Sequence, residues 1–257
     1  MSDRIRDAYA RVAAGVSARP ADASTAVGYT TGDIASVPED ADLGLGCGTP
    51  LRLVTVEPGW TVLDLGSGAG LDCLLAAGRV GPSGRVIGID VVPAMVERAT
   101  ANARSAGVDH VEFRVGDLRE LPVADASVDL VISNCVISLV PDRAEVYHEA
   151  RRVLRPGGHL AVSDTIVTAP LPEELAREVA SRDLAWLTRT DTPGDYVRMV
   201  VDAGFADVAI ASTTPYPPDL AFEDALVDEL VAAGIPSAAI GAAASSMMSL
   251  DVVARRP

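Results

Sequence analysis

Short apolar runs alternate with amphipathic segments along the middle of the chain. Five of the runs have the length and the β-branched content of buried strands, and they lie at residues 61–65, 85–90, 110–115, 128–133 and 159–163. Segments with helical periodicity lie between them, at residues 72–79, 93–105 and 143–154, and the last of these stops at the turn Arg155-Pro-Gly-Gly158. A repeated strand–helix order predicts a parallel sheet with helices on both of its faces.

The two flanks of this region are less regular. Before it, a polar, alanine-rich helix is expected to lead through Arg19 and Pro20 into a glycine- and proline-containing loop over residues 28–50. Thr49-Pro50 predicts a helix start, which would place Cys47 just before a helix N-terminus. After Asp164 the pattern predicts further elements: helices over 173–187 and 193–203, strands over 207–213 and 248–255, and a helical excursion over 215–245.

Composition narrows the class of protein. The 257 residues include 36 acidic and 21 basic side chains, which gives a formal charge of −15, and every basic side chain except the three histidines is arginine. A surface this acidic argues against a nucleic-acid partner. The charged start and the lack of a long apolar run predict a cytoplasmic protein that does not enter the membrane. Three widely spaced cysteines predict thiols instead of a disulfide framework.

The strongest motif is Asp64-Leu-Gly-Ser-Gly-Ala-Gly70, which directly follows one predicted strand and precedes a helix. Glycines at these positions let the backbone turn sharply and approach a ligand closely. Asp90 ends the second strand, where a carboxylate can accept the two hydroxyls of a ribose. Gly116-Asp117-Leu118 follows the third strand, where a carboxylate can read an adenine amino group. Together these three elements predict an adenosine-containing cofactor.

Two cofactor classes fit that arrangement, the nicotinamide dinucleotides and S-adenosylmethionine. A dinucleotide motif spaces its glycines G-x-G-x-x-G and places a pyrophosphate on the helix N-terminus. Here the spacing is G-x-G-x-G, and Asp64 lies two positions before the first glycine. Because a carboxylate repels pyrophosphate but suits a cationic amino-acid tail, the pattern favours S-adenosylmethionine. A nicotinamide-dependent oxidoreductase and a cofactor-binding module without catalysis remain the alternatives from other classes.

The chain resembles the class I S-adenosylmethionine-dependent methyltransferases over residues 62–163, including the turn that ends at Gly158. Within that superfamily it is most similar to the arsenite methyltransferases, through Gly28-Tyr29, Leu43-Gly-Leu-Gly-Cys-Gly-Thr-Pro50, Gly70-Leu-Asp-Cys-Leu-Leu-Ala-Ala77 and Ser133-Asn-Cys-Val-Ile-Ser-Leu139. The resemblance implies an α/β, Rossmann-like, doubly wound and mostly parallel seven-stranded sheet, with helices on both faces and an antiparallel last strand.

The resemblance also implies the site. Cys47 and Cys135 would hold trivalent arsenic as thiolates facing the methyl group, since soft thiolates match a soft metalloid. The arsenic lone pair would attack the methyl carbon without a general base, so proximity and orientation would carry the catalysis. The residues expected to hold the cofactor are Asp64, Gly66, Ser67, Gly68, Gly70, Asp90, Val91, Gly116, Asp117, Leu118 and Asn134. Cys73 is given no chemistry and is expected to pack on the sheet.

One departure from the family leaves a second function open. Arsenite methyltransferases usually carry a further substrate-binding cysteine after the fifth strand, but this chain has none beyond Cys135, and Trp186 lies in that neighbourhood. Either two protein thiolates and a small thiol such as glutathione hold the arsenic, or the pocket takes an organic acceptor. In the second case Trp186, Tyr29 and Tyr196 would shape an apolar pocket for a small secondary metabolite.

The expected organisation is one methyltransferase domain over residues 1–257, present as a monomer or a weak homodimer. Within it, residues 1–50 would form an N-terminal cap and substrate loop, residues 60–165 the cofactor-binding core, and residues 166–257 a part that covers the substrate. Ligands of open α/β sheets bind at the carboxyl ends of the strands, so both flanks are expected to lie there.

Overall fold

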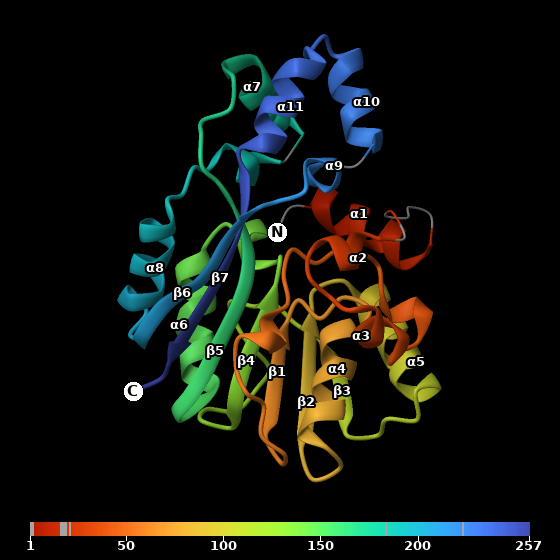
Figure 1. Cartoon of the computed structure of the whole chain (residues 1–257), viewed down its shortest axis with the longest axis vertical. Helices are drawn as coiled ribbons and strands as arrows, with labels where there is room; N and C mark the ends of the chain where they lie inside the picture. The colour runs from red at the N-terminus through yellow and green to blue at the C-terminus, as the bar shows by residue number, and fades with distance from the viewer. Residues whose placement is uncertain (1–2, 16–19, 21, 183, 223) are drawn as a thin grey trace.

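One mixed sheet organises the molecule (Figure 1). The computed structural model describes residues 3–15, 20, 22–182, 184–222 and 224–257. Within them, the strands form a seven-stranded sheet in the order β3-β2-β1-β4-β5-β7-β6, with only β7 antiparallel to its neighbours. Their bounds are β1 Thr61–Leu65, β2 Arg85–Asp90, β3 Val111–Val115, β4 Val128–Asn134, β5 Leu154–Val167, β6 Ala206–Pro215 and β7 Met247–Arg255. The predicted fold class, including the antiparallel last strand, is confirmed.

Helices connect and cover the strands. Their bounds are α1 Asp3–Ala13, α2 Ala23–Ala26, α3 Thr31–Ala35, α4 Leu71–Val80, α5 Pro93–Ser105, α6 Arg143–Val153, α7 Glu173–Ser181, α8 Pro193–Asp202, α9 Pro218–Ala221, α10 Asp224–Ala232 and α11 Ser237–Ser245. Single 3-10 turns lie at η1 Glu39–Ala41, η2 Pro50–Arg52, η3 Ile137–Leu139 and η4 Ala185–Thr188. Capping boxes start α3 and α8: Thr30 with Asp33, and Thr192 with Asp195, satisfy each other's backbone N–H groups. None of the described helices is long and apolar enough to cross a membrane.

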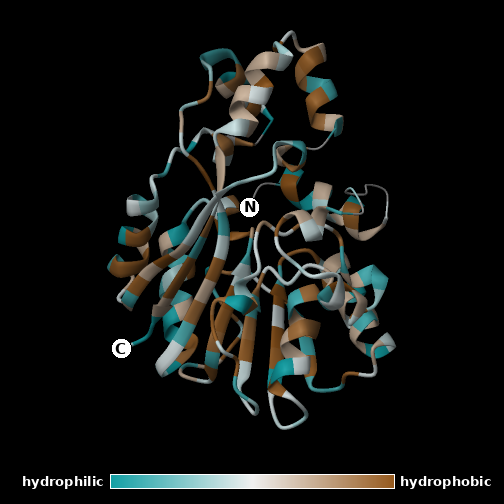
Figure 2. Ribbon diagram, viewed as in Figure 1, coloured by the Kyte–Doolittle hydropathy of each residue, from teal (hydrophilic) through white to brown (hydrophobic). Residues whose placement is uncertain are grey.

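Alternate residues of the central strands feed two separate cores, one on each face of the sheet. Leu63 of β1 packs with Val146 and Tyr147 of α6, whereas its neighbour Val62 packs with Cys73 of α4. Successive side chains of a strand point to opposite faces, so this division places α4 and α6 on opposite sides of the sheet, as Figure 1 also shows. Brown, hydrophobic positions accordingly run along the central strands in Figure 2. The expected packing of Cys73 on the sheet is confirmed.

The start of β5 corrects the prediction. The turn expected over residues 155–158 is already part of the strand, which begins at Leu154 instead of residue 159. Val128 pairs with Leu154 before a register shift, and the backbone of Arg256 exchanges hydrogen bonds with Gly157 and Gly158 at 2.8 and 2.9 Å. These long-range partners extend the strand through residues whose local sequence favours a turn.

Two predicted helices are also wrong in part. Thr49-Pro50 starts only the 3-10 turn η2, which ends at Arg52 and has no side-chain cap from Thr49. Cys47 therefore does not precede an α-helix. The helix expected over 173–187 ends at Ser181, and the separate turn η4 follows at Ala185–Thr188. Arg19 of the predicted N-terminal connection and Asp183 of that helix lie outside the described residues.

The segments after β5 gather beyond the carboxyl ends of the central strands, where Figure 1 shows α7, α10 and α11. Their apolar side chains form one cluster, which we call the cap cluster; its buried members include Leu175, Val179, Leu187, Leu220, Leu230 and Ile240. Cys47 belongs to this cluster, and Cys135 and Trp186 pack against it. The two cysteines thus lie where the sheet meets an apolar cap.

Candidate active site

A cavity of about 290 Å³ opens at the carboxyl ends of β1, β2 and β4. Nine of the eleven residues expected to hold a cofactor line it: Asp64, Gly66, Ser67, Gly68, Asp90, Val91, Asp117, Leu118 and Asn134. Cys135 lines it as well. The N-terminal flank supplies further walls from Arg6, Tyr9 and residues 41–46. The sequence motifs thus converge on one space, as their strand-end positions predict.

Gly70 and Gly116 are not among the residues that line the cavity. A Cβ on Gly70 would lie 3.0 Å from the ring of Phe113, and one on Gly116 would lie 3.0 Å from Pro122. Both glycines therefore allow close packing behind the cavity. The motif spacing did not separate this packing role from contact with a ligand.

Asp90 is held rigidly at the cavity. Its carboxylate accepts the backbone N–H groups of Gly68 and Val92 at 3.0 and 2.9 Å. The neighbouring Ser67 hydroxyl is buried and has no hydrogen-bond partner among the described residues. A buried hydroxyl without a partner is costly, so a polar ligand group in the cavity would satisfy it. A Cβ added to Gly68 would meet no atom within 4 Å, so the backbone there faces open space.

Two buried carboxyl groups, Asp64 and Asp72, line the cavity. Asp64 is 2% exposed and Asp72 is 7% exposed. Burial, and then the proximity of Asp72, raise the pKa of Asp64 well above its usual range. Cys73 donates its S–H to Asp64 over 3.3 Å, and the hydroxyl of Tyr29 donates to Asp72 at 2.8 Å. The site therefore offers carboxylates whose ionisation a cationic ligand would favour.

Asp117 forms a tight pair within the cavity wall. Its carboxylate accepts from Nε and from a terminal nitrogen of Arg119, at 3.0 and 2.7 Å. This pairing lowers the pKa of Asp117 to about 2. Arg119 also lines the cavity. A ligand at this end of the cavity therefore meets an ion pair instead of the free carboxylate that the sequence suggested.

Asn134 connects the cavity to the loop that carries Cys47. Its side-chain oxygen accepts the backbone N–H of Cys47 at 3.0 Å. Its amide nitrogen donates to the Tyr29 hydroxyl at 2.8 Å and to the Gly48 carbonyl at 3.0 Å. Asn134 lies at the end of β4, one residue before Cys135. A single amide thus fixes the position of one cysteine relative to the other.

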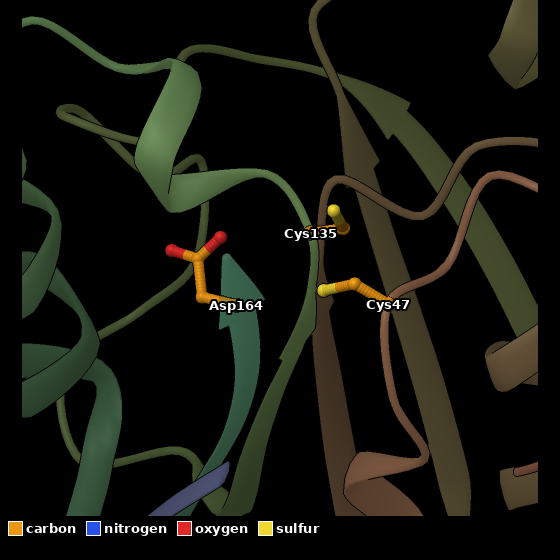
Figure 3. A group of neighbouring side chains, drawn as sticks. All are labelled: Cys47, Cys135 and Asp164. Atoms are coloured by element: carbon orange, nitrogen blue, oxygen red, sulfur yellow. The ribbon is translucent and has the colours of Figure 1, made fainter. Parts of the chain in front are cut away.

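Cys47 and Cys135 meet Asp164 at the edge of the cavity (Figure 3). The two sulfur atoms and one carboxylate oxygen all lie within 4.8 Å of one another. Cys135 has a φ of +59°, a left-handed backbone that is uncommon for a side chain larger than glycine, and its N–H donates to the carbonyl of Ser163 at 2.8 Å. Burial, followed by the neighbouring Cys135, raises the pKa of Cys47 well above its usual range. Cys47 is therefore a thiol until a ligand takes its proton.

Asp164 is the functional candidate that sequence reasoning missed. It is fully buried and lies three residues before the carboxyl end of β5. Its carboxylate accepts the backbone N–H of Ser138 at 2.8 Å and the hydroxyl of Tyr196 at 3.0 Å, and Tyr196 in turn accepts a 2.6 Å hydrogen bond from Tyr147. The available signal was an acidic residue between the apolar runs 160–162 and 166–167, because buried charges are rare unless they are paired.

The loop around Cys47 packs directly on the sheet. A Cβ on Gly48 would lie 2.6 Å from the side chain of Ser163 and 3.0 Å from Asp251. The Ser249 hydroxyl also donates to the Cys47 carbonyl. Gly48→Ala is therefore expected to displace Cys47. It should weaken the binding of phenylarsine oxide, a reagent that binds to two neighbouring thiols at once, at least tenfold. Calorimetry on the variant checks this, and unchanged affinity would show that the loop adjusts without moving the sulfur.

Comparison with known proteins identifies the family of this chain. A model of the methyltransferase domain matches residues 56–204, which is more than half of the chain. The chain belongs to the methyltransferase domain family. Its sheet order and antiparallel β7 agree with the structures of methyltransferases that it resembles in fold.

Individual relatives of this methyltransferase include proteins named for arsenite and for an organic acceptor. An arsenite methyltransferase of Halobacterium salinarum is 48% identical over 191 residues, which are 74% of this chain and 49% of the relative. A nocamycin O-methyltransferase of Saccharothrix syringae is 36% identical over 165 residues, 64% of this chain and 53% of the relative. An arsenic(III) S-adenosylmethionine methyltransferase structure from Chlamydomonas reinhardtii is 29% identical with a TM-score of 0.61, covering 93% of this chain and 74% of that one. The chain spans about half the length of the curated relatives that it matches.

Proposed function

We propose that this chain is an S-adenosylmethionine-dependent methyltransferase whose acceptor is trivalent arsenic bound by Cys47 and Cys135. The observation that carries the proposal is the meeting of two thiols at the edge of a cavity lined by the predicted cofactor residues. Similarity to the arsenite methyltransferase of Halobacterium salinarum supports the same acceptor.

The residues around the cavity fit the cofactor. Asp90 would accept the ribose hydroxyls, and Asp64 would face the cationic amino-acid part. The buried Ser67 hydroxyl offers an unused donor and acceptor, and the backbone at Gly68 leaves space for a ligand. When bound, S-adenosylmethionine supplies an electrophilic methyl carbon and a neutral thioether leaving group.

The two cysteines would position the acceptor. Each thiol proton leaves with a hydroxide of arsenous acid as water, and the thiolate takes the place of that hydroxide on arsenic. The arsenic keeps its lone pair and is nucleophilic without a general base. The rigid contacts of Asn134 and Ser249 with the Cys47 loop then serve to orient that lone pair toward the methyl group.

Turnover of arsenite tests this function. The purified, reduced protein is incubated with S-adenosylmethionine, arsenite and glutathione, and methylated arsenic is measured by mass spectrometry. Methylated arsenic supports the proposal. Confirmed cofactor binding without any arsenic product would reject the acceptor and leave the methyltransferase assignment in place.

An organic acceptor is the second candidate function. Trp186 is half-buried and packs against the cap cluster, to which Cys47 belongs, and one relative is named an O-methyltransferase. The hydroxyls of Tyr29 and Tyr196 are engaged with Asp72 and Asp164. Tyr29 lines the cavity, whereas Tyr196 is fully buried in the core and offers no surface to such an acceptor. Methylation of an organic candidate in the same assay, with no arsenic product, would favour this function.

Cofactor binding is expected to strengthen as the pH rises through the raised pKa of Asp64. The raised pKa of Asp64 keeps its carboxyl group protonated above the usual range in the free protein, while a bound cation favours the ionised form. Binding therefore releases a proton, and Asp64→Asn removes this release. The raised pKa also affects stability without cofactor. Above about pH 4 the unfolded chain loses the Asp64 proton while the folded protein keeps it, so the free energy of unfolding falls as the pH rises.

Calorimetry in buffers of different ionisation enthalpy measures the proton release. Proton uptake on binding, or the same release from the Asp64→Asn variant, would contradict the role of Asp64.

Further parts of the proposal concern the whole chain. We propose one domain in which residues 1–50 cap the cofactor and carry the substrate loop, residues 60–165 bind the cofactor and residues 166–257 cover the substrate. The position of Arg6 and Tyr9 in the cavity wall, and of the cap cluster against Cys47, supports this division. It stays a prediction that glutathione or another small thiol carries the arsenic. It also stays a prediction that the protein is a monomer or a weak homodimer.

A further inference from the structure

We propose that Asp164 is the third ligand of the arsenic atom, an oxygen donor in the role that the family resemblance gives to a third cysteine. This inference rests on the proposed function. It makes the site a mixed one, with sulfur from Cys47 and Cys135 and a carboxylate oxygen from β5.

The geometry brings the three donors to one point. Three equivalent donors on a common centre with zinc-like bonds of about 2.3 Å lie at most about 4.0 Å apart. The three ligand atoms lie within 4.8 Å of one another, so the cysteine side chains must rotate to bring the sulfur atoms closer together around the arsenic. Figure 3 shows that the three side chains come from separate segments that converge at this edge of the sheet.

Asp164 is held in place for this role. The N–H groups of Ser138 and Thr165 and the hydroxyl of Tyr196 fix its carboxylate at 2.8, 2.9 and 3.0 Å. The charge of Asp164 acts on two arginines, Arg143 and Arg189, but both have other partners. Arg143 pairs with Asp191 at 2.8 Å. Arg189 donates to the carbonyls of Ser138 and Val140. The carboxylate is thus oriented by its donors, and one of its oxygen atoms lies within 4.8 Å of both sulfur atoms.

Charge decides which ion suits this set. Two thiolates and one carboxylate carry three negative charges, which a trivalent arsenic centre neutralises. A divalent cation would leave one negative charge in a site where Cys47 and Asp164 are 2% and 0% exposed. Since uncompensated buried charge is costly, the cluster favours trivalent arsenic over zinc or a similar ion.

The exchange of ligands balances. Arsenous acid, As(OH)₃, loses three hydroxides as three molecules of water. Two of the protons come from the two thiols and the third comes from bulk solvent, while the ionised carboxylate forms the third bond to arsenic. No electron is transferred in this step, and the arsenic lone pair remains available for the methyl group.

Two arsenic probes separate the third ligand from the first two. Arsenite has three exchangeable positions, whereas phenylarsine oxide, hydrated in water, has two because a phenyl group occupies the third. Asp164→Asn is therefore expected to weaken arsenite binding at least tenfold and to leave phenylarsine oxide binding within about twofold of the wild type. Calorimetry with each probe on the reduced protein gives both numbers.

A matched control removes a nearby carboxylate that is not a proposed ligand. Asp251, whose charge also acts on Cys47, accepts hydrogen bonds from Ser163 and Ser212 at 2.6 and 2.5 Å. Asp251→Asn is expected to change the affinities for arsenite and for phenylarsine oxide by the same factor. If only Asp164→Asn loses affinity for arsenite selectively, the cause is the missing oxygen ligand, because both variants remove one negative charge.

The outcomes distinguish the inference from the function on which it rests. If the wild type binds neither probe, the proposed function fails. If it binds both, and Asp164→Asn binds arsenite as tightly as the wild type, the third ligand is refuted while the two-thiol site stands. If the variant does not fold, infrared difference spectra of the wild-type protein provide the test. Binding of arsenite should shift carboxylate stretching bands, whereas binding of phenylarsine oxide should not. Equal spectra with the two probes would overturn the inference.

Discussion

Cys47→Ser and Cys135→Ser are each expected to lower arsenite methylation at least a hundredfold while leaving S-adenosylmethionine affinity within about twofold. A serine hydroxyl is a hard, weakly acidic donor and does not replace a thiolate on arsenic. The loss of either ligand also frees the acceptor to rotate away from the methyl group. Cys47 is 2% exposed and packs in the cap cluster, so the smaller hydroxyl is accommodated there without rebuilding the cavity.

Cys73→Ser provides the matched control for these variants. Cys73 is fully buried on α4 and donates to Asp64, but its sulfur belongs to the core beside the cofactor cavity and not to the cysteine pair. It should retain arsenite turnover within a few-fold. Steady-state rates and calorimetry measure both quantities, and turnover that survives in either Cys47→Ser or Cys135→Ser would defeat the two-thiolate site.

Gly66→Ala is expected to weaken S-adenosylmethionine binding at least tenfold and to lower the free energy of unfolding by about 1–3 kcal/mol. The backbone at Gly66 has a φ of +75°, and an added Cβ would lie 2.7 Å from Val136. Because Gly66 and Val136 both line the cavity, the clash changes the shape of the cofactor site. Calorimetry and chemical denaturation measure the two effects.

Gly81→Ala separates backbone strain from the clash. Gly81 has a comparable φ of +66°, but an added Cβ there would meet no atom within 4 Å. This variant should lose about 1–3 kcal/mol of stability from strain, because Gly81 combines its positive φ with a ψ of −177°, and it should keep its cofactor affinity. Equal cofactor affinities in the two alanine variants would mean that the turn after β1 does not shape the cofactor site.

The sequence predicted the elements whose signals are local. Apolar runs located the strands of the central sheet, and the glycine motif with Asp64 and Asp90 located the cavity, because strand ends of a parallel sheet meet at one edge. The errors arose where distant partners decide the conformation. Leu154 belongs to β5 because of its pairing with Val128, a contact that no local window contains.

The candidate site was predictable only in part for the same reason. Cys47 and Cys135 stand out by residue type, but the identity of their neighbour depends on how β5 passes the loop after β4. The sequence did not identify Asp164 as a site residue because an isolated acidic residue belongs to no motif. The packing roles of Gly70 and Gly116 became visible only through Phe113 and Pro122, which follow β2 in the chain.

Transfer of a labelled methyl group tests the central claim most directly. The reduced wild-type protein is mixed with S-adenosylmethionine that carries a trideuterated methyl group, together with arsenite and glutathione, and the arsenic species are resolved by mass spectrometry. We predict a trideuteromethyl arsenical formed in proportion to the enzyme. Absence of that product, from protein shown in parallel to bind both the cofactor and arsenite, would contradict the assignment of arsenic as the acceptor.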